Sequence, residues 1–215
     1  MILHKAEITA MLGGAARLWR ENTTLLGEID ARFGDGDHGV TIGKMAALME
    51  ERLESWRDQS IKVFLEDLSA GFLGINGGSA GPLYGTLLEG LAAPMEDSAA
   101  GIDGELLKAM LAGSRDALFD ITTARVGDKT MMDALIPAAE AAQKAQGGPG
   151  AVLRAAAGAA RDGAQATKAM VSKFGRARSY GEKTLGTRDA GAVSTALFFA
   201  GLEQGYLKGK EEGAP

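Results

Sequence analysis

The sequence predicts an all-α protein: an up-and-down antiparallel bundle or barrel of eight helices with its binding site at one end. Three observations predict this fold class. Apolar residues recur at steps of three and four in eight segments, no convincing stretch of period two appears, and the 31 glycines gather in islands between these segments. At 215 residues and 46% hydrophobic content, residues 1–215 are long enough for one large core, and we expect a single domain.

Each predicted helix is justified by its own apolar stripe, and the seventh is mostly alanine, which allows close approach of a neighbour. The predicted helices cover residues 4–28, 39–57, 61–73, 80–95, 103–121, 129–146, 150–173 and 190–208. In chain order, the stripes contain Ile8, Met11 and Trp19; Ile42, Met45 and Met49; Phe64, Leu65 and Leu68; Leu87, Leu88 and Leu91; Leu107, Met110 and Leu111; Met132, Leu135 and Ile136; Val152 and Leu153; Val193, Leu197 and Leu202.

The connections between these helices fall into two kinds. Those that follow the odd-numbered helices read DARFGDGDHG, GINGGSAGP, TTARVGDK and FGRARSYGEKTLGTRDAG, and are rich in Gly, Asp, Lys and Arg. The other three connections read RDQS, EDSAAGIDG and QGGPG, and they contain no residue pattern that indicates a binding or catalytic site. In an up-and-down bundle all odd-to-even connections emerge at the same end. We therefore expect the four unusual connections to meet on a single rim.

The first connection crowds together three aspartates, Asp30, Asp35 and Asp37. Such like charges repel one another unless a cation lies among them. Their oxygen donors suit Mg²⁺ or Ca²⁺, but an EF-hand is excluded because Ala46, not Glu, is the twelfth residue from Asp35. A zinc site is disfavoured because the chain has only two histidines and no cysteine to serve as ligands. We expect Mg²⁺ with phosphate oxygens; the alternative is a set of solvated loop and N-cap residues.

The other three connections offer groups that bind anions. The glycines of GGSAG can turn backbone N–H groups toward a ligand, and Ser79 can cap the helix whose N-terminus attracts an anion; a plain N-cap is the alternative. No Lys-Ser or Lys-Thr follows at P-loop spacing. Asp189 and Gly191 either meet a ribose or adenine edge or cap the last helix. Further donors, unless they are simply solvated, are Lys129, Thr130, Arg176, Arg178 and Lys183. A rim that holds a cation and a polyphosphate suits phosphoryl transfer.

The bulk composition narrows the class of protein. A net charge of -5 argues against nucleic-acid binding, which favours a basic face. The absence of cysteine excludes disulfides and thiolate metal sites and fits a reducing, cytoplasmic location. Lys5, Glu7 and Arg17 interrupt any signal-peptide pattern, and no apolar run reaches the ~20 residues of a membrane span. We expect residues 209–215 to be a frayed tail.

Four motifs carry a resemblance to a known family. Between Ile29 and Leu197 the chain reads, in order, GDGDHG, GGSAGPLYGT, GDKTMMDALIPA and GRARSYGEKTLGTRDAGA. In these motifs it resembles the nucleotide-binding half of dihydroxyacetone kinases, the DhaL or Dak2 domain. The resemblance implies a barrel of eight helices that holds ADP or ATP and two Mg²⁺ ions at one end. It also implies a phosphotransferase that is active only with a separate DhaK-type subunit, which holds the ketose covalently through its own histidine.

The resemblance implies roles for the matching residues. Asp30, Asp35 and Asp37 would bind the two Mg²⁺ ions and serve catalysis. Phosphate contacts would come from His38, Gly39, Val40, Thr41, Gly78, Ser79 and Ala80. The rest of the nucleotide site would comprise Leu83, Thr130, Met131, Arg176, Asp189, Ala190 and Gly191, with Met131 beside the adenine. The chain is too short for the substrate domain, so it resembles a stand-alone subunit, and His38 is then not the ketose-binding histidine.

The motifs also depart from the family pattern. GDGDHG, GGSAGP and DAGA stand where the family often has GDADHG, GGASGP and DPGA. Gly36 and Ala190 loosen these loops without removing a ligand group. The order Ser79-Ala80 moves a hydroxyl by one residue and leaves open which backbone group meets which phosphate.

Several functions share these motifs. The leading interpretation is transfer of a terminal phosphate from Mg²⁺-bound nucleotide to dihydroxyacetone. The nucleotide is then either resident ADP, rephosphorylated by a DhaM-type protein of the phosphotransferase system, or exchangeable ATP. The ketose can instead be a four-carbon one such as erythrulose. A second class is a nucleotide-state signalling module that binds a transcriptional regulator. A purely structural helical protein is disfavoured, because it would not gather the unusual loops on one rim.

Overall fold

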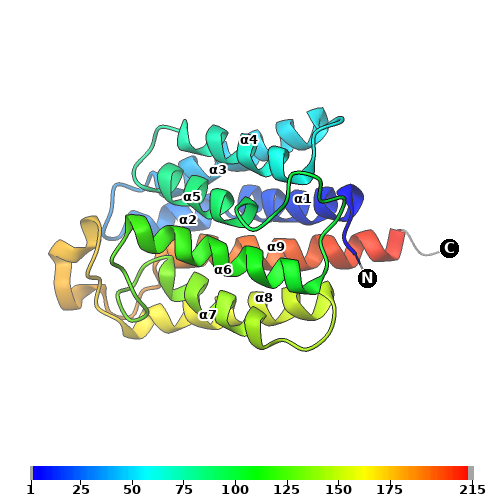
Figure 1. The fold of residues 1–215 in the computed structure, drawn as a ribbon. Coiled ribbons are helices and arrows are strands. Elements are labelled where there is room, and N and C mark those ends of the chain that lie inside the picture. Colours follow the sequence, from blue (N-terminus) through cyan, green and yellow to red (C-terminus); the bar gives the residue numbers. More distant parts are fainter. Residues whose placement is uncertain (1, 213–215) are drawn as a thin grey trace.

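The computed structural model describes residues 2–212, and over this range the chain is helical apart from its connections (Figure 1). An isolated antiparallel bridge between Leu3 and Ile102 is the sole β-type pairing among these residues, so the all-α prediction is confirmed. The helical elements of the described residues are α1 (Lys5–Glu21), α2 (Thr23–Asp30), α3 (His38–Ser55), α4 (Ile61–Leu73), α5 (Ala80–Ala92), α6 (Gly104–Ile121), α7 (Met132–Lys144), α8 (Pro149–Ala166), the 3-10 segments η1 (Thr167–Ala169) and η2 (Arg176–Thr184), and α9 (Ala190–Glu212).

The helices form a closed ring. Each helix packs against the next one along the chain, and α9 returns to pack against α1. The first and last helices run antiparallel: Gly14 lies against Gly201 and Gly205, whereas the earlier Ala10 lies against Gly205 and the later Gly209. Both described ends of the chain lie at one end of this ring, opposite the segment around η2 (Figure 1).

The core centres on Trp19 of α1, which is fully buried. Its ring is surrounded by Phe72 at 6.1 Å, Tyr84 at 5.0 Å and Phe198 at 5.4 Å between ring centroids. Its indole N–H donates a 2.8 Å hydrogen bond to the carbonyl of Ser194. Burying aromatic rings of this size supplies a large share of the hydrophobic stabilisation, because that stabilisation scales with the apolar area removed from water. The core thus joins α1, α4, α5 and α9 around one side chain.

The first predicted helix, 4–28, differs from the structure because it divides into α1 and α2. The break falls at Asn22, whose backbone leaves the helical region (φ -112°, ψ 12°). Its side-chain amide donates a 2.8 Å hydrogen bond back to the carbonyl of Leu18. Such a local side-chain bond offers the backbone an alternative to the helical ladder. One predicted rod is therefore two helices, and Asp30, expected in a loop, is the last residue of α2.

The seventh predicted helix, 150–173, is also shorter than expected. α8 ends at Ala166, and the hydroxyl of Thr167 donates to the carbonyl of Ala164 at 2.6 Å while accepting the backbone N–H of Asp189 at 2.9 Å. These bonds turn the chain into η1. The segment 174–189, expected as a plain loop, contains η2, and a non-helical backbone at Gly181 (φ 52°) kinks it. Alanine periodicity cannot report these contacts, because they come from distant residues.

The remaining boundaries shift by smaller amounts. α5 stops at Ala92, before Pro94, rather than at residue 95, and α7 begins at Met132 rather than at residue 129. α9 continues to Glu212, so residues 209–212 of the expected tail are helical, and residues 213–215 lie outside the described part. Among residues 2–212, no helix combines the length and apolar character needed to cross a bilayer.

We predict opposite effects for two adjacent glycines of α1. A Cβ at Gly14 would overlap the carbonyl oxygen of Gly201, whereas one at Gly13 meets nothing within 4 Å. Gly14→Ala should therefore destabilise the protein by about 1–3 kcal/mol through overpacking. Gly13→Ala should stabilise it by roughly 0.5–1 kcal/mol because alanine loses less entropy in a helix. Urea unfolding midpoints measure both, and equal effects of the two variants would contradict the close α1–α9 packing.

Candidate functional site

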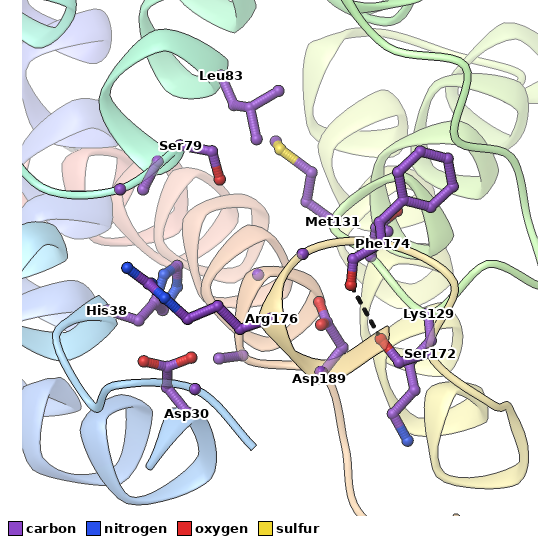
Figure 2. A pocket seen from close by; sticks show the side chains of 18 of the residues that line it. Asp30, His38, Ser79, Leu83, Lys129, Met131, Ser172, Phe174, Arg176 and Asp189 are labelled. Atoms are coloured by element: carbon purple, nitrogen blue, oxygen red, sulfur yellow. Dashed lines mark hydrogen bonds between the residues drawn. The ribbon is translucent and has the colours of Figure 1, made fainter. Parts of the chain in front are cut away.

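A cavity of about 490 Å³ lies at the end of the ring where the four unusual connections meet (Figure 2). Every one of these connections contributes to its lining, which confirms the arrangement predicted from connection order. The predicted site residues among its lining are Asp30, Asp37, His38, Thr41, Gly78, Ser79, Ala80, Leu83, Thr130, Met131, Arg176, Asp189, Ala190 and Gly191.

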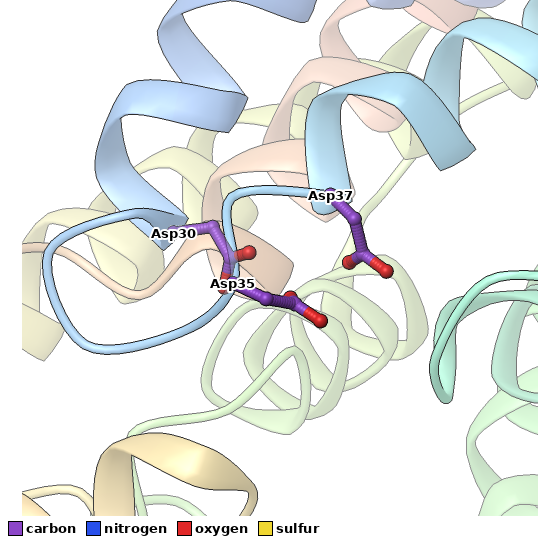
Figure 3. A group of neighbouring side chains, drawn as sticks. All are labelled: Asp30, Asp35 and Asp37. Atoms are coloured by element: carbon purple, nitrogen blue, oxygen red, sulfur yellow. The ribbon is translucent and has the colours of Figure 1, made fainter.

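The three aspartates of the first connection lie close together (Figure 3), and Asp30 and Asp37 line the cavity. Each can offer one carboxylate oxygen such that the three oxygens lie within 4.8 Å of one another. The backbone N–H of Gly36 donates to Oδ2 of Asp30 at 2.8 Å, which folds the loop back onto the end of α2. Gly36 has φ 77°, a conformation that glycine adopts without strain. Asp37 precedes α3 and makes no side-chain capping bond, so its carboxylate remains available to a ligand.

The electrostatics of this cluster suit a divalent cation. Burial and the neighbouring charges of Asp35 and Asp30 raise the pKa of Asp37, while Arg176 opposes this rise. Arg176 reaches across from η2 and pairs with Asp35, with Nη2 2.8 Å from Oδ2. A guanidinium can partner one carboxylate in this way, but a divalent ion can be shared by all three. Oxygen-only donors at this spacing fit Mg²⁺.

A chain of buried hydroxyl groups ties the start of α3 to α5 and α9. Nε2 of His38 lies 2.9 Å from Oγ of Ser194, and the Tyr84 hydroxyl lies 2.8 Å from that oxygen and 2.9 Å from Oγ1 of Thr195. Ser194 and Thr195 both donate to the carbonyl of Gly191, at 3.0 and 2.8 Å. Burial lowers the pKa of His38, which favours its neutral form. The network therefore fixes the acidic loop relative to the turn 189–191.

Two predicted contact residues lie outside the cavity lining. Gly39 packs against α2, where a Cβ would overlap the backbone carbonyl of Thr23, so its glycine serves helix packing. The side chain of Val40 is exposed at the surface of α3. The reason for both departures is helical geometry, because consecutive residues of α3 point in different directions. Asp35 also lies outside the lining, but it belongs to the carboxylate cluster.

The second connection forms a glycine turn before α5. Gly77 has φ 145° and Gly78 φ 57°, so the chain turns sharply before Ser79. Ser79 occupies the N-cap position, yet its side chain makes no capping bond, contrary to the expectation that it caps the helix. Its hydroxyl faces the cavity, and farther along the wall the side chains of Leu83 and Met131 point toward each other (Figure 2). This wall offers an apolar slot next to a polar turn.

Residues 167–189, which we call the strap, connect α8 to α9 and cover another wall of the cavity. The strap contributes the lining residues Ser172, Phe174 and Arg176, of which sequence reasoning missed the first two (Figure 2). It contacts the acidic loop through the Arg176–Asp35 ion pair and through Phe33 and Tyr180, whose rings lie 5.2 Å apart. The sequence feature that could have indicated Phe174 is its position as an isolated aromatic residue directly before a polar run.

Asp189 ends the strap and caps α9. Its Oδ1 accepts the backbone N–H of Ala192 at 2.7 Å, so the N-cap interpretation is confirmed, and its side chain also lines the cavity. Burial raises the pKa of Asp189 to about 7. Sequence reasoning missed the hydroxyl network behind this turn, although Tyr84 lies inside a quoted motif. A Ser194-Thr195 pair within the otherwise apolar α9 was the available signal.

The protein is a ring of helices, and one end of the ring carries a carboxylate cluster, a glycine turn and a cationic strap. These features define an all-α protein with a candidate site for a metal and a polyanion. Comparison with known families identifies the chain more closely. The family model described as the DAK2 domain matches residues 32–204, and the chain belongs to this family.

The relatives are kinases of small ketoses or parts of them. The chain is 34% identical over 200 residues to L-erythrulose 1-kinase of Mycolicibacterium smegmatis, covering 91% of this chain and 34% of that protein. It is 29% identical over 197 residues to the ADP-binding subunit DhaL of the PEP-dependent dihydroxyacetone kinase of Escherichia coli, covering 90% of this chain and 93% of that subunit. The chain thus spans about a third of the length of the erythrulose kinase it matches.

A solved structure shows the same fold. The dihydroxyacetone kinase of C. freundii in complex with AMP-PNP and Mg²⁺ matches with a TM-score of 0.67 and 26% sequence identity, covering 91% of this chain and 33% of that one. The native form of that enzyme matches equally well, with a TM-score of 0.67 and 27% identity.

We predict that the Tyr84 hydroxyl stabilises the protein measurably. Tyr84→Phe removes one buried hydrogen-bond partner from each of Ser194 and Thr195, which keep their bonds to Gly191, and should cost about 1–3 kcal/mol of unfolding free energy. Tyr180→Phe is the matched control, because Tyr180 is 47% exposed, and it should change stability by no more than about 0.5 kcal/mol. Denaturant unfolding of both variants provides the measurement. Equal stabilities would show that the network contributes nothing.

We predict a pH dependence that originates at Asp189. The unfolded chain releases this proton near the ordinary pKa of 3.8, whereas the folded protein retains it up to about 7. Between these values the folded state binds more protons, so this group makes stability fall as the pH rises. Asp189→Asn retains an oxygen acceptor for Ala192 and removes the titration. Wild type should therefore gain stability relative to Asp189→Asn as the pH is lowered from about 7 to about 4, and parallel unfolding curves across this range would refute the assignment.

Proposed function

We propose that this chain is the nucleotide-binding unit of a dihydroxyacetone-type or erythrulose-type kinase. It would transfer the terminal phosphate of a Mg²⁺-bound adenine nucleotide to a small ketose held by a separate DhaK-type protein. The observation that carries the proposal is the convergence of three carboxylate oxygens within 4.8 Å at the wall of a 490 Å³ cavity. Membership of the DAK2 family supports it.

Asp30, Asp35 and Asp37 would hold Mg²⁺, two ions by resemblance to the family. Bound Mg²⁺ would neutralise the charge of the phosphate oxygens and favour transfer of the phosphoryl group. Arg176 approaches this cluster from the strap and already pairs with Asp35. It is therefore placed to exchange this carboxylate for a phosphate oxygen, a partner that a guanidinium binds equally well.

The remaining walls match the parts of a nucleotide. The turn at Gly77 and Gly78 and the N-terminus of α5 offer backbone N–H groups that bind phosphate. Leu83 and Met131 face each other across a slot that suits a flat apolar base (Figure 2). Thr130, Ala190 and Gly191 complete the lining around the slot and the turn at α9.

The rim around the cavity suits docking of a partner that brings the ketose. Six large apolar side chains in or beside the four connections are between 46% and 61% exposed: Val40, Leu73, Ile121, Val126, Tyr180 and Leu185. Exposed apolar side chains gathered around a site are typical of interaction surfaces. The subunit of Escherichia coli that the chain matches over most of its length is a part of a larger kinase, which supports a DhaK-type partner here.

We predict that the acidic cluster is required for phosphoryl transfer. Asp35→Asn and Asp37→Asn each remove a charge that would hold Mg²⁺, and the transfer rate with a DhaK-type partner should fall on the order of 10²-fold or more. Binding of MgADP, measured by calorimetry, should weaken in parallel. The matched control is Asp58→Asn, an exposed aspartate in the connection between α3 and α4 at the opposite end. Full transfer by either cluster variant would end the catalytic proposal and favour a binding role.

The same assay separates the open alternatives. Dihydroxyacetone and erythrulose are offered in parallel, since relatives named for each ketose match the chain. Native mass spectrometry before and after dialysis then identifies the phosphate source. Retained ADP supports a resident cofactor that a DhaM-type protein rephosphorylates, whereas ready exchange of ATP supports an ATP-dependent kinase.

A further inference from the structure

Lys129 is a buried lysine whose ammonium is surrounded by carbonyl oxygens. The residue is 3% exposed. Its Nζ donates to the backbone carbonyls of Thr184 and Thr187 at 2.6 Å, of Thr167 at 3.0 Å and of Met170 at 3.1 Å. No carboxylate pairs with it at ion-pair distance among the described residues. Three N–H groups are thus shared among four acceptors.

Lys129 is among the residues that line the cavity, but the loop before α7 turns its ammonium toward the backbone of the strap. Asp133 accepts the backbone N–H groups of Gly127 and Thr130 at 2.6 and 2.7 Å and so braces the turn between them. Within this turn Lys129 adopts φ 61°, the left-handed conformation that costs a non-glycine residue energy. The side chain consequently runs beneath the strap (Figure 2). The sequence-based expectation that Lys129 holds a polyphosphate is not supported, because its N–H groups are already engaged.

The four carbonyls belong to both ends of the strap. Thr167 and Met170 lie where it leaves α8, and Thr184 and Thr187 lie where it returns toward α9. Between these pairs the chain carries Arg176 and other residues that line the cavity. Without the ammonium, the carbonyls of Met170 and Thr187 would lose their hydrogen bonds to Nζ, while those of Thr167 and Thr184 would still accept the Met170 N–H and the Thr187 hydroxyl. Four carbonyl dipoles would then converge with no donor between them, which is costly. Their arrangement resembles the carbonyl rings that bind K⁺ in place of its hydration shell.

We propose that Lys129 is a positioning residue whose ammonium takes the place of a bound monovalent cation and clamps the two ends of the strap together. The clamp fixes the position of the strap, and the strap is the wall from which Arg176 and Phe174 reach the cavity. The link to nucleotide binding rests on the proposed function, whereas the clamp itself does not.

The test removes the ammonium and then supplies one from solution. Lys129→Gly empties the cage and relieves the left-handed backbone, and Lys129→Met retains most of the side-chain volume without the charge. Lys168→Met, at an exposed lysine of the same strap, is the matched control. Hydrogen exchange of residues 170–188 reports the strap in the absence of nucleotide, and calorimetry reports the affinity for MgADP.

We expect strap amides in both Lys129 variants to exchange at least about tenfold faster than in wild type, with MgADP binding weakened by about tenfold or more, a fold-change that corresponds to about 1.4 kcal/mol. In Lys129→Gly, ammonium or methylammonium chloride should restore most of the protection. Tetramethylammonium chloride at equal ionic strength should not, because it has no N–H group. The Lys168→Met control should match wild type throughout.

Two outcomes would overturn the clamp: wild-type exchange in both Lys129 variants, or a loss that neither ammonium nor methylammonium restores. If wild type fails to bind MgADP, the proposed function fails, while the exchange experiment still decides the clamp. If Lys129→Gly does not fold in sodium buffer, its thermal unfolding in ammonium and in tetramethylammonium buffers provides the same decision, since only the clamp predicts a higher midpoint in ammonium.

Discussion

Direct backbone contact between the first and last helices is the constraint on which the structure depends. At Gly14, Gly201 and Gly205 the backbones of α1 and α9 approach so closely that a Cβ would overlap the facing chain. This contact closes the ring and sets α9 antiparallel to α1. The connections that follow the first, third, fifth and seventh predicted helices all line the cavity at one end of this ring. The polar loops that cannot enter a core are thereby brought together around one cavity.

The cavity is built from two walls of opposite character. The wall formed by α2 and α3 carries three carboxylates, and burial together with the neighbouring charges of Asp35 and Asp30 raises the pKa of Asp37. The strap opposite carries Arg176 and is held from beneath by the Lys129 ammonium. The two walls are joined by the Arg176–Asp35 ion pair and by the contact between the rings of Phe33 and Tyr180. This division suits a ligand that combines a divalent cation with a polyanion.

The residues of the site were predictable to different degrees, for physical reasons. Asp30, Asp35 and Asp37 stand close together in the chain, and their like charges identify the cluster without a structure. Gly39 and Val40 share the same motif, but the rotation of α3 turns one against α2 and the other to the surface. Tyr84 and Ser194 are 110 residues apart, and no local pattern reports their hydrogen bond. Lys129 reads as a free cation in the sequence, whereas four distant carbonyls enclose it.

The helical class of the protein, the place of most helices and the shared end of four connections could be predicted from the sequence, because they follow from apolar periodicity and the order of the elements. The acidic cluster and the family motifs could be predicted as well, because they are local in the chain. The break at Asn22 rests on a local hydrogen bond to Leu18, which apolar periodicity does not report. The 3-10 segments of the strap and the orientation of Lys129 and His38 were visible only in the tertiary structure, because they depend on hydrogen bonds between segments distant in the chain, which override local helix propensity.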